Sequence, residues 1–91
     1  MSTINLTHPT NSTVKINETG DICLNHFSGS SVTLDALGNI IFKTASSGLI
    51  FTLVSATNIA TMIQPTTGAY LMLDAAGNWY VKGTTIQLNP V

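Results

Sequence analysis

The chain has 91 residues, only 8% of them charged, with three Lys against four Asp or Glu, no arginine, and a formal net charge of −1. A domain of this size that folds alone buries only about 60–65% of its unfolded surface, so cross-links, metals or partner subunits usually support it. The single cysteine, Cys23, excludes an intrachain disulfide. We therefore expect a homo-oligomer. Nucleic acids and anionic membranes both require clustered Lys and Arg, so we expect neither as a partner.

The N-terminal residues 1–15 contain neither a basic region nor an apolar core, so they do not resemble a signal peptide. No apolar run reaches the 18 or so residues that a membrane-spanning helix needs. We expect synthesis and folding in a cytoplasm.

Short runs rich in Thr, Val and Ile alternate with Gly, Asn, Asp and Ser along the whole chain, which is typical of strands joined by tight turns. Residues 1–12 are either a polar N-terminal arm or a first strand, and residues 13–91 form a single β domain. Such short, evenly spaced strands predict an all-β fold, a small antiparallel β-sandwich or barrel built from short hairpins. The predicted strands are Thr3–Thr7, Thr13–Asn17, Asp21–His26, Ser31–Asp35, Asn39–Thr44, Leu49–Ser55, Ile59–Gln64, Ala69–Asp74, Asn78–Lys82 and Thr84–Asn89.

One stretch, Ser55–Pro65, is also compatible with a helix, because serine caps helices and proline ends them. Within it, Ile59, Thr61 and Ile63 alternate with other residues at the period of a strand, and we predict a strand.

Several predicted strands are apolar on both faces, among them Ile40–Phe42, Leu49–Val54 and Tyr70–Leu73. A sheet with one face in water would instead alternate apolar and polar residues. The outer faces of these strands therefore lie either in a closed core or against another subunit, and for so small a chain we favour subunit contact.

A ten-residue segment occurs twice, as LDALGNIIFK from Leu34 and as LDAAGNWYVK from Leu73. The shared Asp, Gly and Asn describe a hairpin tip: the carboxylate accepts hydrogen bonds from amides two residues on, and glycine takes the left-handed position that closes the loop. A weaker third copy, INETGDICL, places Gly20 at the glycine position. The repeat predicts structural turn residues at Asp35, Gly38, Asn39, Asp74, Gly77, Asn78 and Gly20.

Chemistry-bearing residues are scarce. The only histidines are His8 and His26, no nucleophile motif of the G-x-S-x-G type is present, and Cys23 and His26 sit three residues apart on a predicted strand and so face opposite ways. The two repeat aspartates lack the spacing of a calcium loop. We expect no enzyme activity, no catalytic or metal-binding residues and no cofactor.

Trp79 and Tyr80 form the richest aromatic patch. Alternation places them on opposite faces of their strand, so that one of them is expected in a core or interface. We treat the pair as a candidate interface or ligand platform.

The segment TGAYLMLDAAGNWYVKGT (Thr67–Thr84) resembles the closing hairpin of small β-rich bacteriophage virion proteins, the capsid decoration or cement proteins and the trimeric tips of tail fibres. Upstream, GLIFTLVSATNIATMIQPTTGAY resembles the Thr-, Ala- and Asn-rich strands that precede that hairpin, so the likeness covers residues 48–91. The resemblance implies a trimer of β-sandwiches or barrels located in the virion, without catalytic residues.

Within that class, the chain starts at Met1 and strand-like sequence begins at Thr3, with no shaft repeat before it. We therefore expect a decoration or cement protein that binds and stabilises the phage head lattice through the major capsid protein or another virion protein. The alternative is a receptor- or glycan-binding tip or knob domain of a tail fibre.

Overall fold

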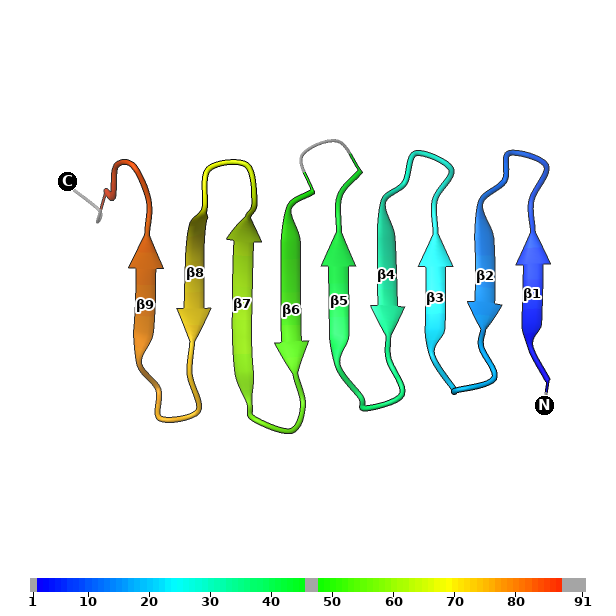
Figure 1. Ribbon diagram of the computed structural model, residues 1–91, viewed down its shortest axis with the longest axis horizontal. Coiled ribbons are helices and arrows are strands. Elements are labelled where there is room, and N and C mark those ends of the chain that lie inside the picture. The colour runs from blue at the N-terminus through cyan, green and yellow to red at the C-terminus, as the bar shows by residue number, and fades with distance from the viewer. Residues whose placement is uncertain (1, 46–47, 88–91) are drawn as a thin grey trace.

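The computed structural model describes residues 2–45 and 48–87. Within these ranges the chain forms nine β-strands and no helix, and the strands lie side by side in chain order (Figure 1). The strands are β1 (Ile4–Thr7), β2 (Thr13–Ile16), β3 (Ile22–Asn25), β4 (Ser31–Leu34), β5 (Ile40–Lys43), β6 (Ile50–Val54), β7 (Ile59–Gln64), β8 (Ala69–Leu73) and β9 (Trp79–Lys82).

The described strands make a single open antiparallel sheet, which confirms the all-β class and the short hairpins. One chain by itself forms neither a sandwich nor a barrel. A sandwich needs a connection that crosses between layers, whereas every connection here is a hairpin that places the next strand beside the last. A barrel needs the first strand to pair with the last, and β1 and β9 lie at opposite ends of the sheet (Figure 1).

Pairing in constant register creates rows of side chains that run across all nine strands. Because side chains alternate between the two faces of a strand, every second row belongs to the same face. Two rows on one face are apolar at every position, and we call this surface the apolar face. One row contains Ile4, Ile16, Ile22, Leu34, Ile40, Leu53, Ala60, Leu73 and Trp79, and the other contains Leu6, Val14, Leu24, Val32, Phe42, Phe51, Met62, Leu71 and Val81.

The opposite face changes character along the sheet. Over β1–β4 its rows hold mainly Thr, Ser, Asn and Lys15, whereas over β5–β8 they include Ile41, Ile50, Ile63 and Met72. The opposite face over β5–β8 is therefore mixed, because these apolar residues lie beside Lys43, Thr52 and Thr61.

No described residue is buried, so the described part of the chain has no hydrophobic core of its own. On the apolar face, Leu6 is 66% exposed, Trp79 62% and Ile4 57%. A single sheet covers each side chain only from its neighbours in the plane, so apolar groups stay in contact with water. The described chain by itself therefore gains little free energy from hydrophobic burial.

Two local predictions meet different outcomes. The ambiguous stretch Ser55–Pro65 contains strand β7, which confirms the strand interpretation over the helix. The tenth strand predicted over Thr84–Asn89 is wrong for residues 84–87, of which 84 and 85 form a bend and 86 and 87 are irregular, while residues 88 and 89 lie outside the described residues. Only Gly83 separates β9 from Thr84, and the tightest hairpin needs a loop of two residues.

A shorter period underlies the repeat found in the sequence. Residues with positive φ recur every nine positions in the first half of the chain, at Asn11, Gly20, Gly29 and Gly38. The period equals a four-residue strand plus a five-residue connection. This period is hard to see in the sequence because asparagine takes the place of the first glycine and the strand residues differ between copies. The signal that could have revealed it is the regular spacing of four residue pairs, Thr10-Asn11, Thr19-Gly20, Ser28-Gly29 and Leu37-Gly38.

Replacing Gly77 with alanine tests the turn geometry. Gly77 has φ +88° and open space around the position of a Cβ, so the cost comes from backbone conformation and not from a clash. We expect Gly77→Ala to reduce the free energy of unfolding by about 1–2 kcal/mol. Gly83→Ala is the matched control, because its φ is not positive and its Cβ meets only ordinary contacts. Equal thermal melting curves for the two variants, at equal protein concentration, would contradict the turn assignment.

Candidate functional site

The first copy of the repeat forms the turn between β4 and β5. Gly38, at φ +85°, donates its N–H to the carbonyl of Asp35 at 2.9 Å. The Asp35 carboxylate accepts the N–H groups of Leu37 (2.9 Å) and Asn39 (3.0 Å) on Oδ1 and the Asn39 Nδ2 group (3.0 Å) on Oδ2. The aspartate thus replaces the missing backbone partners of the loop, as an Asx turn does.

The second copy repeats this geometry between β8 and β9. Asp74 Oδ1 accepts the N–H groups of Ala76 (3.0 Å) and Asn78 (2.9 Å), and Gly77 donates to the Asp74 carbonyl at 3.0 Å. Its Oδ2 accepts Asn78 Nδ2 at 3.3 Å and also the Tyr80 hydroxyl at 2.9 Å. Tyr80 is therefore tied to the turn that precedes it.

These hydrogen bonds shift the pKa values of three side chains. The backbone N–H of Asn39 lowers the pKa of Asp35 below 3.8, and that of Asn78 does the same for Asp74. The hydrogen bond to Asp74 raises the pKa of Tyr80 above 10.0. Both carboxylates are ionised at neutral pH. Because the pKa of each aspartate is lower in the folded chain than the unfolded value of 3.8, its ionisation contributes to the free energy of unfolding. This contribution is fully present above pH 3.8 and is lost as the pH falls through the lowered pKa values.

The third, weaker copy holds Gly20 at φ +93°, donating its N–H to the Asn17 carbonyl at 2.9 Å. It belongs to a series in which the fifth residue of each loop accepts a backbone N–H from the next loop along the same edge. The pairs are Ser12 Oγ with Phe27 (2.9 Å), Asp21 Oδ1 with Ala36 (2.6 Å), Ser30 Oγ with Ala45 (3.1 Å) and Asn39 Oδ1 with Ser55 (3.0 Å). These contacts fix the loops of each edge relative to one another.

Trp79 and Tyr80 lie on opposite faces of β9. Trp79 pairs with Leu73 and ends one row of the apolar face, while Tyr80 pairs with Met72 on the opposite face. The two rings therefore do not form one stacking platform. Trp79 is the larger apolar side chain left exposed at this end of the sheet.

The histidines stabilise turns locally. His8 Nδ1 lies 2.9 Å from Thr10 Oγ1, and His26 Nδ1 lies 2.8 Å from Ser28 Oγ, each within its own loop. Among the described residues no three His, Cys, Asp or Glu side chains come close enough to hold a metal ion.

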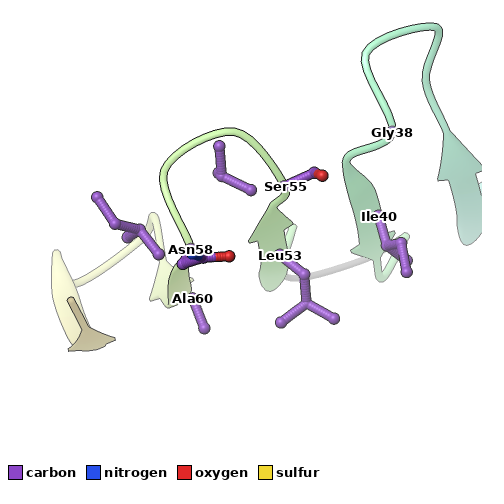
Figure 2. A pocket seen from close by; sticks show the side chains of 8 residues that line it. Gly38, Ile40, Leu53, Ser55, Asn58 and Ala60 are labelled. Atoms are coloured by element: carbon purple, nitrogen blue, oxygen red, sulfur yellow. The ribbon is translucent and has the colours of Figure 1, made fainter. Parts of the chain in front are cut away.

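A hollow of about 340 Å³ opens near the turn end of β5, β6 and β7 (Figure 2). Ile40, Leu53 and Ala60 are neighbours in one row of the apolar face, and the short side chain of Ala60 interrupts an otherwise bulky row. Ser55 and Asn58 border the hollow on the loop side, and no titratable residue lines it. Its shape suits an apolar side chain of a packing partner better than a reacting substrate.

The part of the chain that the structure describes includes no helix long and apolar enough to cross a membrane. No protein-family model, curated protein or solved structure matches this chain. The sheet's own surfaces are therefore the basis for assigning a function, and the apolar face is the one whose two rows are apolar across all nine strands.

The tie between Tyr80 and Asp74 predicts a change in one carboxyl pKa. Tyr80→Phe removes a donor from Asp74 Oδ2, so we expect the pKa of Asp74 to rise toward 3.8. Asp35 has an equivalent turn without a tyrosine and serves as the internal control, with an unchanged pKa. Carboxyl chemical shifts followed by NMR through an acid titration measure both. A shift of equal size at both aspartates would count against this contact.

Proposed function

We propose that the chain is a structural subunit of a bacteriophage virion, a decoration or cement protein that works by assembly and not by catalysis. The observation that carries the proposal is the uncovered apolar face. A sheet of nine strands with two uninterrupted apolar rows on one face, and no buried residue in the described chain, reaches stability only when something covers that face. Subunits that pack against one another have such an uncovered apolar face. An enzyme of this size needs its own hydrophobic core to position catalytic side chains.

The size of the apolar face supports a permanent interface. Nine strands about 4.8 Å apart and four residues of about 3.4 Å give a flat footprint on the order of 600 Å². The accessible area of its projecting side chains exceeds that footprint and is comparable with the roughly 800 Å² per partner of a standard protein interface. The face carries no charged residue, which is typical of obligate interfaces.

A homotrimer would cover this face. Three copies with their apolar faces inward would shield the apolar rows of each copy from water. In this proposal the sandwich- or barrel-like fold expected from the sequence exists in the assembly and not in one chain.

The opposite face supplies a second, smaller contact surface. Ile41, Ile50, Ile63 and Met72 gather over β5–β8, outside the proposed trimer core. We propose that this surface contacts the major capsid protein or another virion protein, with the polar half over β1–β4 left in solvent. The proposed virion location depends on this proposed contact. A receptor- or glycan-binding tip is the weaker candidate, because Trp79 and Tyr80 face opposite ways and Tyr80 already bonds Asp74.

Substitution on each side of one strand tests the assembly. We expect Phe51→Asp to abolish the oligomer, because a charge would enter the dry core. Thr52→Asp is the matched control on the next residue, facing the other way, and should leave the oligomer intact. Light scattering should give three times the 9.6-kDa chain mass for the natural protein and for the control. A natural protein that is a stable monomer would overturn the self-assembly proposal.

The virion location has a separate test. In particles purified from a culture that produces the chain, quantitative mass spectrometry should find it in many copies per particle. We expect gentle removal of the protein to lower the temperature at which the particles rupture, since a cement protein stabilises the lattice by binding it. Its absence from the particle fraction, with a trimer still present in solution, would reject the virion assignment alone.

A further inference from the structure

The charged side chains of this chain are sorted to opposite edges of the sheet. All four acidic residues, Glu18, Asp21, Asp35 and Asp74, lie in the loops that join β2–β3, β4–β5 and β8–β9, which we call the acidic edge, the lower edge in Figure 1. Lys43 and Lys82 end β5 and β9 at the other edge, which we call the cationic edge. The remaining lysine, Lys15, lies within β2.

The ten-residue repeat produces this sorting. Each copy carries an aspartate in its second position and a lysine in its last, Asp35 with Lys43 and Asp74 with Lys82. The turn uses the aspartate, the glycine and the asparagine, but it makes no use of the lysine. The hairpin therefore does not explain why the lysine is repeated.

A lysine cannot reach the aspartate of its own repeat. Lys43 pairs with Ser31 and Lys82 with Tyr70, four residues before Asp35 and Asp74 respectively. Four residues of strand place each acid and lysine about 14 Å apart, at opposite ends of one hairpin. Both lysines are exposed, and both carboxylates are ionised at neutral pH. Each repeat thus presents a negative and a positive group at the same position along the strand order, which we call the same level, but on different edges of the sheet.

We propose that copies of this chain associate around an axis parallel to the side-chain rows, with the acidic edge of one copy beside the cationic edge of the next. Rotation about such an axis preserves the level of every strand, so Asp35 faces Lys43 of its neighbour and Asp74 faces Lys82. A two-fold axis parallel to the strands would instead bring like edges together and place acids beside acids. The inference rests on the proposed self-assembly and adds its direction, register and contact residues.

The paired edges act on specificity more than on strength. Exposed ion pairs contribute little to stability, whereas complementary charges select the orientation of two surfaces and penalise the wrong one. The apolar rows alone do not fix register, because sliding the sheets by one strand still apposes apolar residues. The Asp–Lys pairs at β5 and β9 can both form only when neighbouring copies meet with each strand at the same level. The contact is heterologous, since different edges meet, and closes into a ring.

Zero-length carbodiimide coupling tests the register, because it joins a carboxylate to an amine only when the two are in contact. The natural chain is expressed in ¹⁴N and ¹⁵N forms, mixed under denaturing conditions, refolded and coupled. Mass spectrometry should find Asp35–Lys43 and Asp74–Lys82 cross-links that contain both isotopes. Lys43→Gln should remove the first cross-link and keep the second.

Charge reversal gives an independent measurement. Lys43→Glu combined with Lys82→Glu places acid beside acid, and we expect the oligomer to dissociate at a protein concentration about tenfold higher or more. Lys15→Glu, away from both edges, is the control and should leave the dissociation concentration unchanged. A stable oligomer with neither the predicted cross-links nor this sensitivity would overturn the edge-to-edge arrangement alone. If the natural chain forms no oligomer at all, the proposed function fails together with the inference.

Discussion

The organisation of this protein depends on one constraint, the shortness of its connections. A loop of a few residues can only return the chain as a neighbouring antiparallel strand, so nine strands remain in one layer. Constant register then aligns like residues into rows, and two of the rows on one face are apolar across all nine strands. Because no described segment crosses to a second layer, the described part of the chain does not cover that face. The absence of buried residues in the described chain and the exposure of its large side chains both follow from this constraint.

The turns stabilise the sheet without help from a core. Asp35 and Asp74 satisfy the amides of their loops, and side chains such as Ser12 and Asn39 connect each loop to the next one on the same edge. Such contacts are local and polar, so they persist while both faces are in water. They define the flat shape and the edges, whereas hydrophobic burial between copies would provide most of the free energy.

The repeated segment determines both a hairpin tip and the position of two opposite charges. Its aspartate, glycine and asparagine build a hairpin tip, and its aspartate and lysine place opposite charges on opposite edges at one level. A chain with so few charged residues uses four of its seven in this way. Low overall charge reduces repulsion between copies, while the placement of these few charges would decide how the copies meet.

The sequence by itself determined the local structure. Nine strands were predicted near their observed positions, because β-branched runs and Asx–Gly turns act over a few residues, and the opposite directions of Trp79 and Tyr80 follow from alternation alone. Only the tertiary structure decided that the strands form one open layer in constant register. Register depends on how each loop closes, which is why the uninterrupted apolar rows and the two charged edges were not visible in the sequence. The strand expected at Thr84 failed for a related reason: its alternation is local, but pairing needs a loop that the single Gly83 cannot provide.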